Sequence, residues 1–249
     1  MIDKSKIIAE FQRIKSLGYV KSLRPSNKDG GIGNTFEDYL GVTENNLRLP
    51  DFEGFEVKSK RAFNTSYITL FSKSPSHPKG ANAILKDKFG EVRDPDFPLL
   101  KKLYASIFGN RSGLVYNNFY MKLNVDRKSR KLILHITDKI TNEVYDEVYW
   151  DFDVLEYASS KMKSLFVVYA NQKEIDDVYH YHYEKATIFL NFNFDKFIDC
   201  VENGKIMFDI RIGVHKSGSN YGKPHDHGSG FRVKKENISD LYEEVFEIN

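Results

Sequence analysis

Two carboxylates and a lysine stand close together in the segment "LPDFEGFEVKSK": Asp51, Glu56 and Lys58. Side chains alternate between the two faces of a strand, so Glu56 and Lys58 share a face, about 7 Å apart along the chain. The carboxylates and the main-chain carbonyl of Val57 are hard oxygen ligands of the kind that Mg²⁺ prefers. A lysine beside them can orient an attacking water or stabilise charge on a phosphate. The spacing predicts a metal-dependent phosphodiesterase.

The D-x4-E-x-K spacing is a weak signal by itself, because the chain has 37 basic and 35 acidic residues. A charge pair on a solvated strand edge is the competing interpretation. The catalytic interpretation is favoured by position, because the E-x-K lies at the centre of a predicted strand and a glycine-rich loop and a helix precede it. That helix, in "TFEDYLG", adds a third carboxylate, Glu37. Glu37 either faces the metal pocket or stabilises the first helical turn through the helix dipole.

Those elements belong to a mixed α/β pattern, in which apolar periodicity indicates helices flanking a sheet. The glycine-rich segment 24–34 is predicted to be a loop. Helices are predicted over residues 3–17, 35–41, 151–163, 194–204 and 237–245. Strands are predicted over residues 55–59, 67–71, 119–124, 131–137, 143–150, 164–173, 182–192 and 205–215.

Composition sets the class of protein. The chain has 249 residues, 41% hydrophobic and 29% charged, which is typical of a globular fold. Its single cysteine, Cys200, excludes a disulfide framework or a cysteine-based zinc site within one chain and suits a reducing cytoplasm. We expect no membrane-spanning helix, because no apolar run approaches ~20 residues. The net charge of +2 is too small to predict nucleic-acid binding unless the basic residues gather on one face.

Several motifs in the same order resemble one family. "GGIGNTFEDYLG", "LPDFEGFEVKSK", "ITLFSKSPSHPKGAN", "VYWDFD" and "DIRIGVHKSGSNYGKPHDHGSGFR" are similar to segments of the MvaI/BcnI family of type II restriction endonucleases, and more to its MvaI branch. This family belongs to the PD-(D/E)xK nucleases and is related to the mismatch-repair nicking enzyme MutH. The resemblance implies a PD-(D/E)xK core and two lobes that form a DNA clamp.

The resemblance also implies roles and partners. Asp51, Glu56 and Lys58 match the family's catalytic acid, acid and lysine, and Glu37 matches a helix glutamate that assists in the related nicking enzyme. The family uses Mg²⁺ and acts as a monomer on double-stranded DNA at a short pseudo-palindromic site. MvaI-like members read CC(A/T)GG and BcnI-like members read CC(C/G)GG. A monomer with one active site cuts the two strands in succession, and a cognate DNA methyltransferase is expected in the same system.

Residues 205–215 are predicted to place Asp209 and Arg211 on one face of a strand. An arginine can make two hydrogen bonds to guanine, and an aspartate can accept one from cytosine N4, so this pair suits a C·G base pair. In the family the matching D-x-R reads bases in the major groove. The alternative is an ion pair within the strand.

The loop "HKSGSNYGKPHDHGSGFR" has the composition of a DNA-facing element, because glycines allow close approach and basic groups suit phosphates and guanine. A zinc site at its H-D-H sequence is the less favoured interpretation, since no cysteine is near. A second basic loop, "LFSKSPSHPKGAN", either binds phosphates or is simply solvated. The candidate DNA-binding residues of the two loops are Lys216, Lys223, His225, Asp226, His227, Arg232 and Lys73.

We therefore predict a catalytic lobe over about residues 1–110 and a DNA-recognition lobe over about 111–249, with strands exchanged between them. A MutH-like strand-specific nicking enzyme is one alternative. A DNA-binding protein without catalysis is another, and the intact Asp51, Glu56 and Lys58 argue against it. A glycosidase with paired carboxylates is disfavoured, because a lysine lies beside Glu56 and no aromatic sugar platform surrounds the motif.

Overall fold

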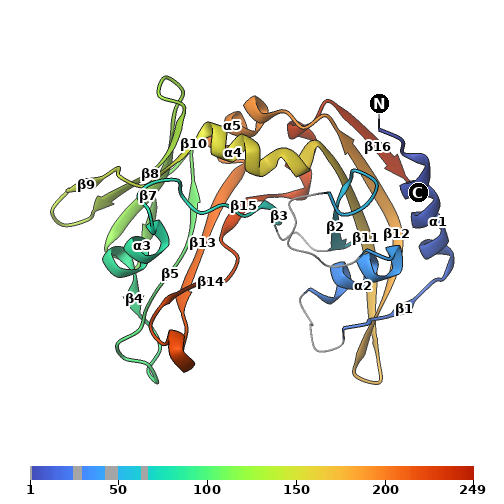
Figure 1. Cartoon of the computed structure of the whole chain (residues 1–249), viewed down its shortest axis with the longest axis horizontal. Coiled ribbons are helices and arrows are strands. Elements are labelled where there is room, and N and C mark those ends of the chain that lie inside the picture. Colours follow the sequence, from blue (N-terminus) through green and yellow to red (C-terminus); the bar gives the residue numbers. More distant parts are fainter. Residues whose placement is uncertain (1, 25–29, 43–49, 63–66) are drawn as a thin grey trace. The chain divides into compact units, whose positions relative to one another are not determined.

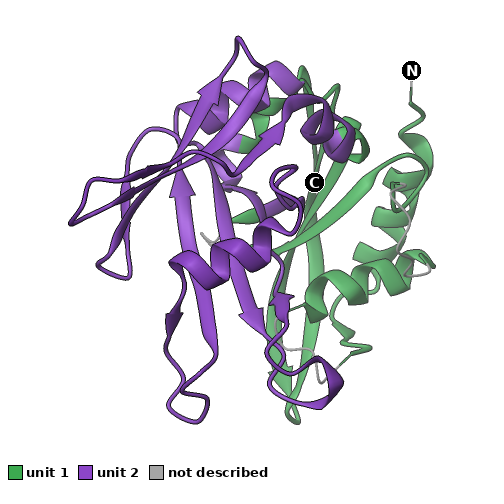
Figure 2. Ribbon diagram, turned by 60° about the vertical axis from the view of Figure 1, so that its left-hand side comes forward, with its two compact units in different colours: residues 1–68, 160–193, 238–249 green, residues 69–159, 194–237 purple. Residues whose placement is uncertain are grey.

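The computed structural model describes residues 2–24, 30–42, 50–62 and 67–249 (Figure 1). The described residues form a mixed α/β fold whose contacts divide the chain into two compact units. Unit 1 comprises residues 1–68, 160–193 and 238–249, and unit 2 comprises residues 69–159 and 194–237 (Figure 2). The chain therefore passes between the units four times. The predicted boundary near residue 110 lies inside unit 2.

Unit 1 is built on a sheet with the strand order β1-β12-β11-β2, and β16 also pairs with β12. The β11 and β12 strands form a long antiparallel hairpin, whereas β2 runs parallel to β11. This arrangement buries β2 beside an apolar strand, as parallel pairing requires. The strand bounds are β1 Val20–Lys21, β2 Glu56–Arg61, β11 Ser164–Ile175, β12 Val178–Leu190 and β16 Glu244–Ile248.

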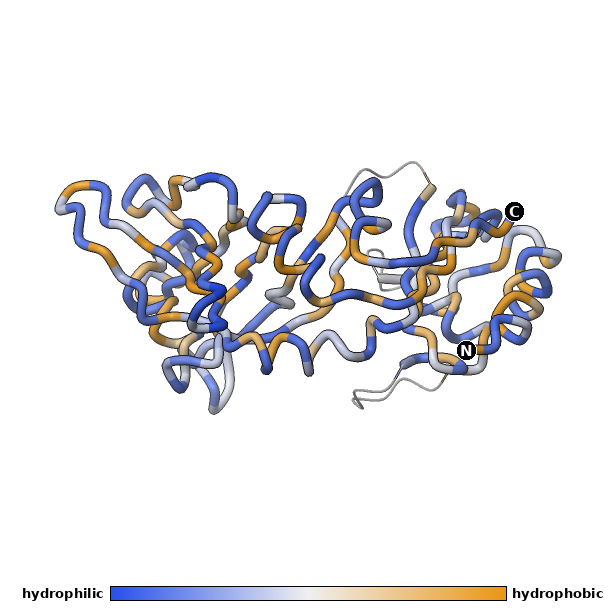
Figure 3. Tube along the Cα trace, turned by 90° about the horizontal axis from the view of Figure 1, so that it is seen from above, coloured by the Kyte–Doolittle hydropathy of each residue, from blue (hydrophilic) through white to orange (hydrophobic). Residues whose placement is uncertain are grey.

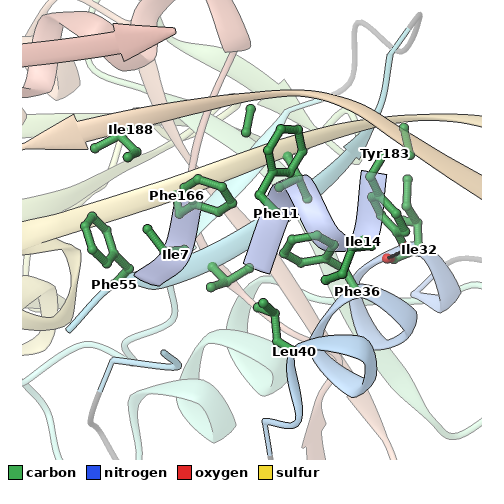
Figure 4. Close-up of a cluster of buried hydrophobic side chains, with 14 of the residues drawn as sticks. Ile7, Phe11, Ile14, Ile32, Phe36, Leu40, Phe55, Phe166, Tyr183 and Ile188 are labelled. Atoms are coloured by element: carbon green, nitrogen blue, oxygen red, sulfur yellow. Dashed lines mark hydrogen bonds between the residues drawn. The ribbon is translucent and has the colours of Figure 1, made fainter. Parts of the chain in front are cut away.

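Helices α1 (Ser5–Ser16) and α2 (Gly31–Leu40) contribute the core that covers one face of this sheet. The α1 trace, which follows the N label in Figure 3, has both hydrophobic and hydrophilic segments, as expected of a helix with one buried face. Figure 4 shows the apolar side chains of the two helices meeting those of the strands. Because Val57 belongs to this core, strand alternation directs Glu56 and Lys58 to the opposite face.

Unit 2 contains two sheets, with strand orders β3-β15-β13-β5-β4 and β10-β8-β7-β6. Trp150 joins them in one core, because its ring packs against Phe208 and Phe231. The strands are β3 Ile68–Phe71, β4 Glu91–Val92, β5 Lys101–Phe108, β6 Gly113–Val115, β7 Phe119–Asp126, β8 Lys131–Asp138, β9 Val144–Tyr145, β10 Tyr149–Asp151, β13 Ile206–Val214, β14 Pro224–Asp226 and β15 Gly230–Val233. The helices of this unit are α3 Ala81–Phe89, α4 Phe152–Ser159 and α5 Phe194–Glu202, and its 3-10 turn is η2 Gly218–Asn220. The 3-10 turn η1 Ser160–Lys163 belongs to unit 1, and η3 Lys235–Leu241 leads from unit 2 back into unit 1.

Three sequence predictions of secondary structure are wrong. The described end of the predicted loop 24–34 is helical, because α2 begins at Gly31 with Gly33 and Asn34 donating to the carbonyl of Gly30. The predicted strand 143–150 is two short strands, β9 and β10. The predicted helix 237–245 is instead η3 followed by β16, since pairing with β12 outweighs the local helical pattern.

In the described part of the chain, no helix has the length and apolar character needed to cross a membrane.

Candidate active site and nucleic-acid interface

A tight turn before β2 brings Asp51 beside the strand. Phe52 and Phe55 exchange backbone hydrogen bonds of 3.0 and 2.7 Å, and Gly54 adopts a φ of 86° in this turn. A positive φ costs glycine little, so this residue suits the turn. As a result, Asp51 Oδ2 accepts a hydrogen bond of 2.8 Å from the amide of Val57, the residue between Glu56 and Lys58 on β2.

Glu56 is a buried carboxylate whose two oxygens have different surroundings. Its residue is 1% exposed. Oε1 accepts from Lys58 Nζ at 2.5 Å and from Lys161 Nζ at 2.7 Å. Oε2 is buried and has no hydrogen-bond partner in the described structure. A buried acceptor without a partner is costly, so Oε2 lies where a ligand is expected to bind.

The chemistry of this donor set fits a hard divalent cation. Asp51 and Glu56 supply carboxylate oxygens, and burial raises the pKa of Asp51, with the neighbouring charge of Glu56 adding to the increase. The Val57 hydrogen bond and the charges of Lys58 and Lys161 act in the opposite direction. A cation beside two partly desolvated carboxylates would stabilise both in their charged forms.

Glu37 comes from α2, a helix that packs against β2. Glu37 Oε1 is 4.0 Å from the position that a Cβ on Gly33 would occupy, so its side chain reaches back along its own helix. Among the described residues, no group of three or more His, Cys, Asp or Glu side chains could hold a metal ion. The assistance expected of Glu37 therefore stays a prediction.

Lys161 is a site residue that the sequence did not suggest. It lies in η1, immediately before β11, and is 105 residues from Glu56 in the chain. The parallel pairing of β11 with β2, in which Leu165 is opposite Glu56, brings η1 to the end of the catalytic strand. The only signal in the sequence is a lysine just before an apolar strand. The sequence does not indicate that this strand pairs with β2.

Replacing Lys161 by alanine is expected to lower the cleavage rate about tenfold, because one of two ammonium groups that orient Glu56 is lost. Single-turnover cleavage of a DNA duplex measures this rate. Lys163→Ala is the matched control, since Lys163 lies on the same turn and is exposed. Equal rates for the two variants would contradict a role for Lys161.

The candidate DNA-reading residues lie on one sheet face of unit 2. In β13 the apolar side chains of Phe208, Ile210 and Ile212 are buried, while Asp209 and Arg211 alternate with them on the other face. Pairing of β13 with β15 adds a second arginine, since Arg232 is opposite Met207 on that face. The sheet thus gathers Asp209, Arg211 and Arg232, which are 23 residues apart at most in the sequence.

Three histidines cluster on the loop that follows. The ring centroids of His215 and His225 are 4.5 Å apart, as are those of His225 and His227. Burial lowers the pKa of His227, and the charge of His225 lowers it further. The His227 ring lies against Gly213, where a Cβ would be 2.6 Å from Nε2.

Asp226 holds this loop in place. Its Oδ1 accepts from the amides of Gly228 and Ser229 at 2.9 and 2.6 Å, and its Oδ2 accepts from Asn82 Nδ2 at 3.0 Å. Ser229 Oγ in turn accepts from the Arg211 amide at 2.8 Å. The Asp226 carboxylate therefore orders the loop between the histidines and the arginines.

The candidate phosphate-binding lysines have varied surroundings. Lys216 pairs with Asp94 at 2.5 Å and lies over the Phe97 ring, beside a cavity of about 190 Å³ that His227 also lines. Lys223 donates to Asn220 Oδ1 at 3.0 Å. Lys73 is half-buried, and its carbonyl accepts from the Trp150 indole at 2.9 Å, which fixes its backbone.

Gly213→Ala is expected to displace His227 from the sheet, because a Cβ would be 2.6 and 2.8 Å from two atoms of its ring. We predict that cognate DNA binds about tenfold more weakly, which corresponds to the loss of one good base contact. Fluorescence anisotropy with a labelled duplex measures the affinity. Gly113→Ala is the control, since an added methyl there meets nothing closer than 4.0 Å. Equal affinity for the two variants would show that His227 does not contribute.

Comparisons with known proteins agree over nearly the whole chain. The model of the MvaI/BcnI restriction endonuclease family matches residues 8–242. A solved complex of restriction endonuclease MvaI with its cognate DNA substrate is similar over 100% of both chains, with 32% identity and a TM-score of 0.89. The structure of MvaI in the absence of DNA is 33% identical over 100% of this chain and 99% of that one, with a TM-score of 0.65. No curated protein sequence matches. Glu56 and Lys58 on β2 are met by Asp51 from the preceding turn and by Lys161 from η1. With this site and a family match of this extent, the chain belongs to the MvaI/BcnI restriction endonuclease family and is a type II site-specific endonuclease.

Proposed function

We propose that this endonuclease hydrolyses double-stranded DNA in a Mg²⁺-dependent reaction at a short pseudo-palindromic site, CC(A/T)GG, and leaves 5′-phosphate and 3′-hydroxyl ends. The observation that supports the catalytic centre is the environment of Glu56, where one carboxylate oxygen accepts from two lysines and the other is buried without a partner. This arrangement orients the free oxygen and leaves it available to a ligand.

In the proposed site, Asp51, Glu56 and the carbonyl of Val57 hold the cation. When bound, Mg²⁺ supplies Lewis acidity that acidifies water and offsets charge on the phosphate. Lys58 is 28% exposed on its side chain, so it can reach both Glu56 and substrate. Its ammonium orients the attacking water and stabilises the charge that develops on the phosphate oxygens. Lys161 donates to the same oxygen of Glu56 as Lys58 does and helps to orient this carboxylate, and Glu37 assists from α2.

Recognition is proposed for the polar face of β13 and β15 in unit 2. Arg211 and Arg232 suit guanine, because a guanidinium donates two parallel hydrogen bonds to guanine O6 and N7. His225 and His227 are proposed base contacts, whereas Lys73, Lys216 and Lys223 neutralise phosphates and make binding salt-dependent. The solved complex of MvaI with its cognate DNA substrate supports duplex DNA as the partner.

The assembly is proposed to be a monomeric, cytoplasmic clamp that cuts the two strands in succession. The catalytic residues belong to unit 1 and the proposed reading residues to unit 2, so each lobe has a distinct task. A cognate methyltransferase would protect host DNA at the same site.

A plasmid digest tests this proposal. The protein is incubated with plasmid and Mg²⁺, beside a reaction with EDTA, and the fragment ends are sequenced. We expect a nicked intermediate, then discrete fragments that end at one five-base-pair motif, and no product with EDTA. Nicked circles that are never linearised would instead identify a strand-specific nicking enzyme. Intact plasmid with folded protein and several divalent metals would reject catalysis.

A further inference from the structure

Asp209 is a buried carboxylate, and both of its oxygens contact other side chains of the protein. Its residue is 5% exposed. Oδ1 accepts from Ser106 Oγ at 3.0 Å, across the β5–β13 pair. Oδ2 accepts from Arg211 Nε at 2.7 Å and lies 3.1 Å from Arg232 Nε. The Arg232 contact is an ion pair rather than a hydrogen bond, because its buried Nε has no hydrogen-bond acceptor. A cytosine amino group would find this carboxylate covered and already engaged.

The two arginines are like charges held together by this one carboxylate. The Arg211 side chain is 48% exposed and that of Arg232 is 17% exposed. Burial lowers the pKa of Arg232, the Asp209 charge raises it, and the Arg211 charge lowers it. Without Asp209, the two guanidinium groups would repel each other and separate.

The geometry leaves the outer nitrogens of these arginines for DNA. Both contacts to Asp209 are made through Nε. Arg232 Nη2 donates to the carbonyl of Gly228 at 3.1 Å, and the terminal nitrogens of Arg211 make no hydrogen bond within the described residues. A guanidinium fixed through Nε still presents its two terminal nitrogens to a planar acceptor pair such as guanine O6 and N7.

We infer that Asp209 and Ser106 are positioning residues, which hold Arg211 and Arg232 as one unit so that a single carboxylate controls the reading of two bases. This inference rests on the proposed function, in which the two arginines contact guanine. It differs from the direct contact of Asp209 with cytosine that the sequence suggested.

The test compares cleavage of the cognate duplex with cleavage of duplexes that each have one substituted base pair. Arg211→Ala and Arg232→Ala first identify the positions that each arginine reads. Asp209→Asn is then expected to lose discrimination at both sets of positions together, by about tenfold at each. KM is expected to change more than kcat. Affinity for unrelated DNA is expected to rise, because a negative charge is removed from a DNA-binding face.

Ser106→Ala provides the second variant, because Ser106 is exposed and the change removes only the hydroxyl that donates to Asp209. We expect a loss of discrimination of a few-fold at the same positions. Ser106→Thr should restore it, and Ser112→Ala is the control on an exposed loop of the same unit. These serine variants decide the question if Asp209→Asn does not fold.

The outcomes separate the inference from the proposed function. Loss of discrimination at one base pair only in Asp209→Asn would indicate a direct base contact and overturn the inference. Altered preference in the arginine variants with no change in Asp209→Asn or Ser106→Ala would also overturn it alone. Unchanged preference in both arginine variants would overturn the proposed recognition surface and the inference together.

Discussion

Lys58→Ala is expected to lower the cleavage rate by about 10³-fold while leaving the affinity for cognate DNA nearly unchanged. Two lysines contact Glu56, and Lys58 is the one that lies on β2 beside it. The ammonium of Lys58 is 2.5 Å from Glu56 Oε1. Its removal takes away a charge that is needed most when negative charge develops on the phosphate. Lys161 remains to pair with Glu56, so the variant should fold.

Single-turnover cleavage and anisotropy measure the two quantities for Lys58→Ala. Lys6→Ala is the matched control, because Lys6 has an exposed ion pair with Glu53, and such pairs contribute little. The control should cut at the rate of the unaltered protein. A Lys58→Ala variant that also cuts at this rate would reject the proposed catalytic centre. A parallel loss of DNA affinity would assign Lys58 to ground-state binding instead.

Glu56→Gln is expected to abolish binding of the divalent cation. It is also expected to lower the cleavage rate by about 10⁴-fold, which is a larger loss than that of Lys58→Ala. The amide has nearly the same shape but no charge, so Lys58 and Lys161 would be left without their shared anion. Two ammonium groups without that carboxylate repel a cation rather than attract it. The substitution thus alters both the cation site and the orientation of the lysines.

Calorimetric titration with Mg²⁺ or Mn²⁺ reports on the cation site independently of cleavage. Glu53→Gln is the control, since Glu53 is exposed in the turn that precedes β2. Retained cation binding in Glu56→Gln, at the affinity of the control, would exclude Glu56 as a ligand. Lost binding together with a normal cleavage rate would show that this cation is not required for the reaction.

The sequence by itself determined the local features of the catalytic strand. The alternation of side chains along a strand follows from its local backbone geometry. The shared face of Glu56 and Lys58 was therefore predictable from sequence, as was the shared face of Asp209 and Arg211. Motif order was enough to indicate the family, which the family match confirms.

Only the tertiary structure decided which distant groups meet these residues. The parallel register of β11 with β2 brings Lys161 to Glu56 across 105 residues. Pairing of β13 with both β15 and β5 brings Arg232 and Ser106 to Asp209. Which strands pair depends on burial and on all the other strands that compete as partners. The local sequence of one strand gives information on neither. For the same reason the sequence left open whether Asp209 contacts cytosine or pairs with Arg211 within the strand, whereas the fold adds Arg232 to an Asp209–Arg211 ion pair.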